Sequence, residues 1–157
     1  MKTNTLGLPI EETKQLITDL NVLLANFQVY YQNLRGLHWN IRGKRFFDLH
    51  IKFEELYNDS QLKIDEIAER VLTLGGVPLH TFSDYIEANQ LEVGKNISND
   101  EKAVQLVIQS LASLLQIERK ILEASGEIND EGTNAMMSGF ITEQEKTIWM
   151  MNAWLDQ

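Results

Sequence analysis

A long amphipathic helix is predicted by residues 46–78, which read FFDLHIKFEELYNDSQLKIDEIAERVLTLGGVP. Its apolar side chains recur at helical spacing, at Phe53, Tyr57, Ile64, Ile67 and Val71. Gly75-Gly76 followed by Pro78 is a strong helix terminator. We therefore expect one helix from about Phe46 to Leu74, with its apolar face packed against other elements.

The residues before this segment predict a second long helix. It is expected to begin at Pro9, a residue that is tolerated in an opening turn, and its apolar side chains keep helical spacing from Leu16 to Leu34. Gly36 and the stretch Asn40–Gly43 are expected to break this helix.

The residues after the terminator predict a crossover and two further long helices. A short helix at Ser83–Asn89 is expected within the crossover, which extends to residue 98. The third long helix opens on a capping-box pattern at Ser98–Glu101 and ends at Gly126. The fourth starts in the region Asp130–Thr133 and ends near Leu155.

The pattern of helices predicts the fold class. Four long amphipathic helices, two short connections and one long crossover describe an all-α, ferritin-like four-helix bundle. The short helix then lies in the crossover between the second and third long helices. A chain of 157 residues has the size of one domain, so residues 1–157 are expected to form a single ferritin-like domain.

Composition limits the classes of function. The 43% hydrophobic and 24% charged content is that of an ordinary globular protein. The chain has no cysteine, so any metal site must use nitrogen and oxygen ligands. A net charge of −9 argues against a surface that attracts nucleic acid and suits a protein that gathers cations. Residues 1–16 lack the apolar core of a signal peptide, and no apolar run approaches the ~20 residues of a membrane span, which favours the cytoplasm.

The helix predicted over residues 46–74 carries a polar stripe beside its apolar one. Successive residues advance about 100° around a helix, so the members of this stripe fall within an arc of roughly 100°. They are His50, Glu54, Asn58, Gln61, Asp65 and Glu69. One interpretation is a solvated face with incidental charges. The other is a metal site, because a histidine stands at one end of the stripe and two carboxylates share a face at the other.

The distance between the histidine and the carboxylates excludes a metal site formed by one copy of this helix. His50 lies fifteen residues before Asp65, or roughly 22 Å along the helix axis at about 1.5 Å per residue. A second copy running antiparallel would bring the histidine end of one helix to the carboxylate end of the other. His38, twelve residues before His50, would join the histidine end if the turn at residues 40–45 folds the chain back. These residues suggest an oligomer with its chemistry at a two-fold interface.

The same residues resemble the pattern of a known family. The stretch Leu37–Asn40, the polar stripe and the stretch Leu74–Pro78 are similar to the Dps family, or miniferritins, which are DNA-binding proteins from starved cells and their non-DNA-binding relatives. The family's ferroxidase pattern is His-Trp, a second His twelve residues on, and Asp and Glu twenty-seven and thirty-one residues after the first His. These positions are occupied by His38, His50, Asp65 and Glu69, with Glu54 at a further acidic position of the family.

The resemblance implies twelve subunits arranged as a hollow shell, with ferroxidase sites at the two-fold interfaces. Each two-iron site would take His38 and His50 from one subunit and Asp65 and Glu69 from its neighbour. The implied reaction is oxidation of Fe(II) by hydrogen peroxide, with dioxygen as a slower oxidant. Ferric oxide would then be stored inside the shell, which would protect DNA from oxidative damage.

Individual roles also follow from the resemblance. Asp65 would bridge the metal ions, Glu69 would complete the ligands of one iron, and Glu54 would support the histidine side. Trp39, beside a ligand, would donate an electron or trap a radical. The alternative is that a bulky aromatic residue at a helix hairpin simply packs well.

Iron must also reach the interior of such a shell. An acidic cluster, Glu127, Asp130 and Glu131, lies at the start of the last helix, the part of the fold that lines the family's three-fold entry channels. Repeated around an axis, these carboxylates would focus cations. The alternative is a solvated helix start, where acids are favoured in any case. Glu55 is a weaker candidate for mineral nucleation, and His80 is expected to be a surface residue.

DNA binding is expected to be weak or absent. Residues 1–8 contain one lysine and the sequence ends at Gln157 without a lysine-rich extension, whereas non-specific binding needs several phosphate contacts. Arg42, Lys44 and Arg45 could form a local basic patch. Two alternatives stay open: a non-catalytic, DNA-compacting shell protein, and a shell that binds zinc without iron turnover. Association of the cytoplasmic protein with the nucleoid is also left open.

Overall fold

The computed structural model describes residues 1–156, and the regular structure within that span is helical apart from one isolated bridge between Thr3 and Pro9. The helices are α1 (Ile10–Asn40), α2 (Phe46–Thr73), α3 (Phe82–Ala88), α4 (Asp100–Glu127) and α5 (Glu131–Leu155). The all-α prediction and the short helix in the crossover are confirmed. No helix in residues 1–156 combines the length and the apolar character that a membrane crossing demands.

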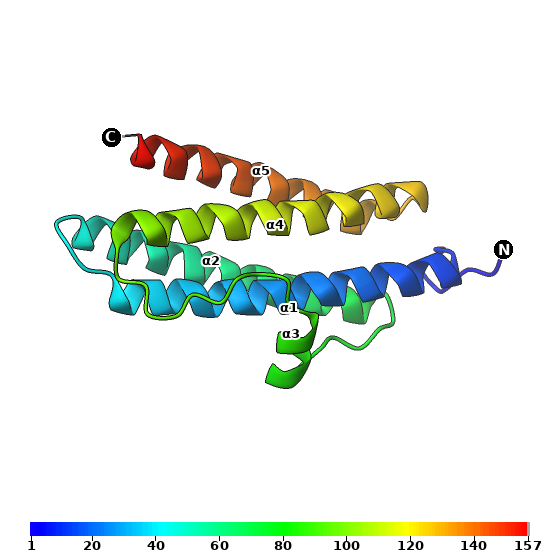
Figure 1. Cartoon of the computed structure of the whole chain (residues 1–157). Coiled ribbons are helices and arrows are strands. Elements are labelled where there is room, and N and C mark those ends of the chain that lie inside the picture. Colours follow the sequence, from blue (N-terminus) through cyan, green and yellow to red (C-terminus); the bar gives the residue numbers. More distant parts are fainter. Residues whose placement is uncertain (157) are drawn as a thin grey trace.

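The four long helices form two antiparallel hairpins that pack on each other (Figure 1). Helix α1 pairs with α2 and helix α4 with α5, and the two hairpins meet through α1 and α4. The crossover from α2 to α4 runs back along α1, and α3 lies against α1 on the outside of the bundle. One long crossover among four antiparallel helices is the connectivity of a ferritin-like bundle.

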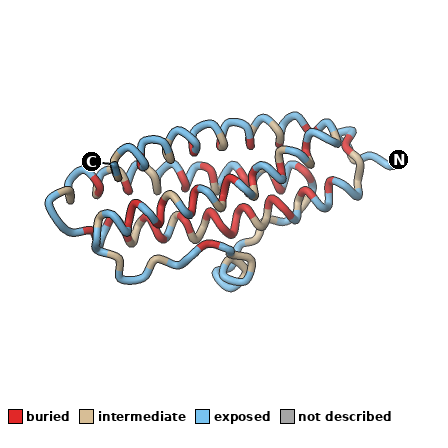
Figure 2. The backbone as a smooth tube through the Cα atoms, turned by 45° about the horizontal axis from the view of Figure 1, so that its top comes forward, coloured by how far each residue is buried: buried red, intermediate tan, exposed pale blue. Residues whose placement is uncertain are grey.

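The core lies between the two hairpins, where the apolar stripe of each long helix faces inward (Figure 2). The Phe27 ring of α1 makes edge contacts with Tyr30 and with Phe140 of α5, at 6.2 Å and 6.0 Å between ring centroids. Each large apolar side chain buried here contributes about 1.5–3 kcal/mol to folding. The most completely buried of them include Leu20, Leu23, Phe53, Ile67, Leu114, Ile121 and Met137.

Helix α1 begins one residue later than predicted and passes through Gly36, but it ends at the other predicted break, the stretch Asn40–Gly43. Pro9 precedes the helix as its N-cap instead of opening it, and the helix continues through Gly36 to Asn40. A glycine inside a helix costs only about 1 kcal/mol relative to alanine, and burial of Leu34 and Leu37 on either side outweighs that cost. The prediction that Gly36 breaks the helix is therefore wrong. Because α1 runs one turn further, its last turn includes His38.

Side chains and a glycine define the other helix ends. The N-cap of α4 is Asn99, whose Oδ1 accepts a hydrogen bond from the Lys102 amide at 2.9 Å. The cap therefore lies one residue after Ser98, the cap of the predicted capping box. Asp130 caps α5 by accepting a hydrogen bond from the Thr133 amide at 3.1 Å. Helix α2 ends before Gly75, whose φ of +91° favours glycine and confirms the predicted terminator.

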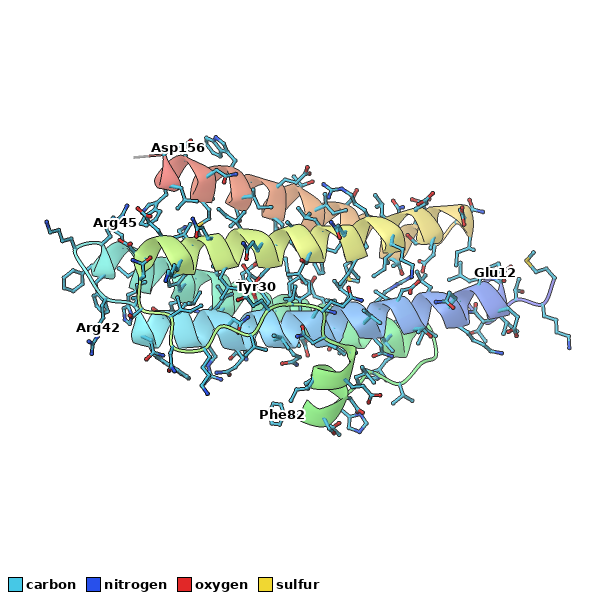
Figure 3. All side chains as sticks on the ribbon, in the orientation of Figure 1. Glu12, Tyr30, Arg42, Arg45, Phe82 and Asp156 are labelled. Atoms are coloured by element: carbon cyan, nitrogen blue, oxygen red, sulfur yellow. The ribbon has the colours of Figure 1, made fainter. Side chains whose placement is uncertain are left out.

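A buried carboxyl group interrupts the apolar interior. Glu118 of α4 is fully buried, and its Oε1 accepts a hydrogen bond from the Gln144 side chain of α5 at 2.7 Å. Tyr30 lies midway along the same interior (Figure 3). Burial raises the pKa of Glu118 to about 8, against smaller opposing effects of the Gln144 hydrogen bond and of the Lys63 and Arg119 charges. Glu118 is therefore protonated in the folded protein at neutral pH.

The free energy of unfolding is expected to fall as the pH rises from 4.5 to about 8. In the unfolded chain Glu118 ionises near pH 4.5, whereas the folded chain keeps this proton up to about pH 8. The folded state binds more protons in that window, so it loses stability as the pH rises. Glu118→Gln cannot ionise, and we expect it to be more stable than the parent by a few kcal/mol at the upper end of the window.

Denaturant unfolding of the two proteins at both ends of this window, at one protein concentration, measures the effect. The Glu118→Gln protein should show the flatter pH dependence. An identical pH dependence in the two proteins would show that Glu118 does not carry the effect.

Candidate metal centre

The histidine pair lies at the end of the bundle where the α1–α2 hairpin turns. His38 is in the last turn of α1 and His50 is in the second turn of α2. Their rings stack, with 3.8 Å between centroids and 11° between planes. Arg42 and Arg45, labelled in Figure 3, belong to the connection at this end. The turn brings the two imidazoles together, as the sequence predicted.

Each histidine is held by the backbone of the other. His38 Nδ1 lies 2.6 Å from the carbonyl oxygen of His50, and His50 Nδ1 lies 2.7 Å from the carbonyl oxygen of His38. A carbonyl oxygen can only accept a hydrogen bond, so Nδ1 of each ring must carry the proton and donate it. Of the two neutral tautomers of each ring, the hydrogen bonds thus favour the one that is protonated at Nδ1.

This tautomer places a lone pair on Nε2 of both rings. Within residues 1–156 neither Nε2 atom takes part in a hydrogen bond with a protein group. A metal-binding histidine normally donates its other ring N–H to a carbonyl or carboxylate, which fixes the ring and raises its basicity as a ligand. Both histidines of the pair donate Nδ1–H to a carbonyl oxygen in this way.

Aromatic rings enclose the pair on two sides. The Phe46 ring stacks on His50 at 4.8 Å and 19°, and the Tyr57 ring meets His38 edge-on at 5.4 Å and 84°. The Tyr57 hydroxyl lies 3.4 Å from Glu54 Oε1, to which it donates. Glu54 itself is exposed, one helical turn after His50. This position suits the supporting role that was predicted for Glu54.

The carboxylates of Asp65 and Glu69 lie further along α2, on its exposed surface. Within the described chain neither carboxylate forms an ion pair or a side-chain hydrogen bond. Fifteen residues of unbroken helix separate Asp65 from His50, which is about 22 Å. In residues 1–156 no three His, Asp or Glu side chains come together as a metal cluster. The chain thus unites the two histidines but not the four predicted ligands.

Trp39 lies outside the histidine pair. Its indole is 57% exposed, and the Arg35 guanidinium lies over it at 4.9 Å from the ring centroid. Within the described residues its ring makes no stacking or edge contact with either histidine. Its predicted redox role stays a prediction.

The residues of the predicted iron entry differ in their surroundings. Asp130 is buried, and its carboxylate accepts from Thr133 and from Arg70 Nη2, the latter at 2.5 Å. Glu127 and Glu131 are exposed on either side of it. A cation could therefore meet the carboxylates of Glu127 and Glu131, whereas that of Asp130 is already neutralised. The entry channel itself stays a prediction.

Two further predicted residues lie at the surface. Glu55 pairs with Lys52 at 2.8 Å between Oε2 and Nζ, and both side chains are substantially exposed. His80 is exposed, and its Nδ1 lies 3.0 Å from the Pro78 carbonyl oxygen, to which it donates. The surface location of His80 agrees with the prediction.

Two features of the site were missed in the sequence. Tyr57 belongs to the apolar stripe by its spacing, but it also stands seven residues after His50 and so shares a helix face with it. That spacing was a usable signal. The reciprocal Nδ1 hydrogen bonds had no sequence signal, because their acceptors are backbone carbonyls.

Comparison with known proteins agrees with this fold. Residues 17–157 match the family model of the ferritin-like domain. A DNA protection during starvation protein of Porphyromonas gingivalis is 42% identical over 94% of this chain and 93% of its own length. General stress protein 20U of Bacillus subtilis is 35% identical over 91% of this chain and 99% of its own length.

A known crystal structure also matches the structure of this chain. The Dps protein of Vibrio cholerae O1, described as a member of a broad superfamily of ferritin-like diiron-carboxylate proteins, matches with a TM-score of 0.96 and 52% identity. The match covers 99% of this chain and 98% of that one. The fold thus defines a ferritin-like protein. Within that class the chain belongs to the Dps family. This membership confirms the resemblance and supports iron storage, DNA protection and a stress-response role in general terms.

Proposed function

We propose that the protein oxidises Fe(II) at sites shared between two subunits and stores the ferric product in a shell of twelve. The observation that carries this proposal is the histidine pair, with two Nε2 lone pairs presented and both rings fixed by reciprocal hydrogen bonds. Hydrogen peroxide is the proposed oxidant and dioxygen a slower one. One ferritin-like domain over residues 1–157 is part of the same proposal.

A site shared between subunits is proposed because one chain does not bring all four ligands together. The imidazoles of His38 on α1 and His50 on α2 lie far from the carboxylates of Asp65 and Glu69, which stand further along α2. Each of these two groups can bind a metal, but one chain does not bring them together. An antiparallel second copy of α2 would bring the two groups together around a two-fold axis, because such an interface pairs each end with the other.

Exposed apolar side chains support an oligomer. Large apolar residues are exposed on several helices, whereas a monomer rarely leaves many together on its surface. They include Phe47 and Leu62 on α2, Phe82 and Ile86 on α3, and Trp149 on α5. Contact between subunits would remove them from water.

The residue types suit iron oxidation. Carboxylate oxygens stabilise the harder ferric product, whereas neutral imidazoles hold Fe(II) without adding charge. Asp65 is the proposed bridging ligand, Glu69 completes one iron's ligands, and Glu54 assists the histidine side. Iron here is the substrate. Hydrogen peroxide takes one electron from each of two Fe(II) ions and two protons from solvent, and becomes two waters.

Protection of DNA in this proposal is chemical. Removing Fe(II) and peroxide together prevents them from forming hydroxyl radicals. Physical DNA binding is proposed to be weak, since Arg45 of the possible basic patch is already paired with Asp100 at 2.8 Å and lies over the Trp154 ring at 3.9 Å. A net charge of −9 also opposes contact with phosphates.

Asp65→Ala is expected to abolish fast Fe(II) oxidation. Removing even a hydrogen-bond partner of a metal ligand costs about 10–100-fold in affinity or activity, so removing a bridging ligand should cost at least as much. The measurement is the ultraviolet absorbance rise when hydrogen peroxide is added to anaerobic Fe(II)-loaded protein. Glu66→Ala is the matched control, because Glu66 is the next carboxylate along α2 and is also exposed.

Equal, slow oxidation in parent and Asp65→Ala would contradict the proposal. Tight zinc binding at these ligands without iron turnover would then favour the zinc-binding shell. A DNA gel shift that persists in moderate salt would favour the DNA-compacting shell.

A further inference from the structure

Tyr57 adjoins the histidine pair, and a phenol is a side-chain group that can give up one electron. Its ring meets the His38 ring edge-on at 5.4 Å between centroids, and it also meets the Tyr31 ring at 6.0 Å and 85°. The Tyr57 side chain is half-buried, whereas Trp39 is 57% exposed. An electron leaving Tyr57 therefore needs to cross only the imidazole of His38 to reach a metal on Nε2.

The phenol of Tyr57 also has an acceptor for its proton. A phenol that loses an electron becomes strongly acidic and must release its proton to a nearby base. The Tyr57 hydroxyl lies 3.4 Å from Glu54 Oε1, and both residues are one turn apart on α2. Electron and proton can therefore leave Tyr57 in different directions at the same time.

Further aromatic groups connect Tyr57 to the surface. Tyr31 contacts Tyr57 on one side, and the Arg35 guanidinium lies over the Tyr31 ring at 5.4 Å from its centroid. The same guanidinium lies over the Trp39 ring at 4.9 Å. The order from the histidine pair outward is thus Tyr57, Tyr31, Arg35 and Trp39.

We propose that Tyr57 supplies the second electron to hydrogen peroxide when only one Fe(II) occupies a site. This inference rests on the proposed ferroxidase function. One Fe(II) alone can give peroxide a single electron, which breaks the O–O bond and releases a hydroxyl radical. With Tyr57, the peroxide takes one electron from Fe(II), one from the phenol and two protons, of which one is phenolic and one comes from solvent. The products are two waters, Fe(III) and a neutral tyrosyl radical.

A later Fe(II) completes the cycle. It gives one electron to the tyrosyl radical, which takes up a proton and becomes tyrosine again, and the ion becomes Fe(III). Each half of the cycle oxidises one Fe(II) and leaves no oxygen radical. The oxidising equivalent can wait on Tyr57 or on Tyr31, which are in ring contact.

Freeze-quenched electron paramagnetic resonance tests the role of Tyr57. Protein loaded anaerobically with one Fe(II) per site is mixed with hydrogen peroxide, and iron oxidation is followed in parallel by absorbance. The parent should give a tyrosyl signal that narrows when the tyrosines are ring-deuterated. Tyr57→Phe, which keeps the ring and its packing, should lose this signal and should release more hydroxyl radical to a spin trap.

Two variants serve as controls. Tyr85→Phe should behave as the parent, since Tyr85 lies on α3 and donates to the Leu79 carbonyl at 3.1 Å, away from the histidines. A radical signal that does not narrow on tyrosine deuteration, that remains in Tyr57→Phe and that is lost in Trp39→Phe would overturn the proposal in favour of Trp39. Iron oxidation with no Tyr57-dependent radical would overturn the role of Tyr57 alone. A parent that oxidises no Fe(II) would overturn the ferroxidase function and this inference together.

Discussion

Replacing Arg70 by leucine is expected to lower the free energy of unfolding by about 3–5 kcal/mol. Arg70 Nη2 donates to the buried Asp130 at 2.5 Å, and its Nε donates to Thr133 Oγ1 at 2.9 Å. The side chain of Asp130 is 2% exposed, so removing the guanidinium leaves a carboxylate buried without its counter-charge. The pair also joins α2 to the start of α5, two helices from different hairpins.

Glycine at position 132 makes this pair possible. A Cβ atom at Gly132 would lie 2.8 Å from the Arg70 guanidinium nitrogens, so a larger residue there would displace the guanidinium. Denaturant unfolding at one protein concentration measures the stability of Arg70→Leu. Arg119→Leu is the matched control, because Arg119 pairs with Glu145 at 3.4 Å with both side chains about half exposed, and such pairs contribute about 0–1 kcal/mol.

A double variant separates the buried charge from the lost packing. Arg70→Leu combined with Asp130→Asn removes both charges, so it should be less destabilised than the sum of the two single variants. Simple additivity of the two single effects would show that the charges of Arg70 and Asp130 are not coupled in the folded protein.

The fold could be predicted from the sequence because each long helix has one sustained apolar stripe and a clear stop. Gly75, with its positive φ, ends α2 where the Gly-Gly-x-Pro pattern predicted. Gly36 was misjudged because the cost of one glycine is small beside the burial of Leu34 and Leu37. Asn99 was missed as the cap of α4 because Ser98 and Asn99 are both good N-cap residues, and only the backbone decides between them.

The candidate site could be predicted in part. The spacing of His38 and His50 and the turn between them predicted that the imidazoles meet. Their tautomer could not be predicted, since it depends on backbone carbonyls whose positions follow from the packing of α1 on α2. The ion pair between Asp130 and Arg70 could not be predicted either, because Arg70 lies sixty residues earlier in the sequence. The shared site and the shell stay predictions.

Mixing two inactive variants tests the shared site most directly. One variant carries His38→Ala and His50→Ala, and the other carries Asp65→Ala and Glu69→Ala. In a two-fold pair of unlike subunits, one site loses all four ligands and the other keeps all four. Random pairing of equal amounts makes half of the pairs unlike, so about a quarter of the parent's iron oxidation should return.

The measurement is the rate of Fe(II) oxidation by hydrogen peroxide in oligomers assembled from both variants, with their composition checked by mass spectrometry. Each variant alone, and the two mixed without subunit exchange, should stay inactive. Return of about a quarter of the parental rate only after exchange is the result predicted for a site shared around a two-fold axis. Mixed oligomers that contain both subunits and remain inactive would contradict the shared site.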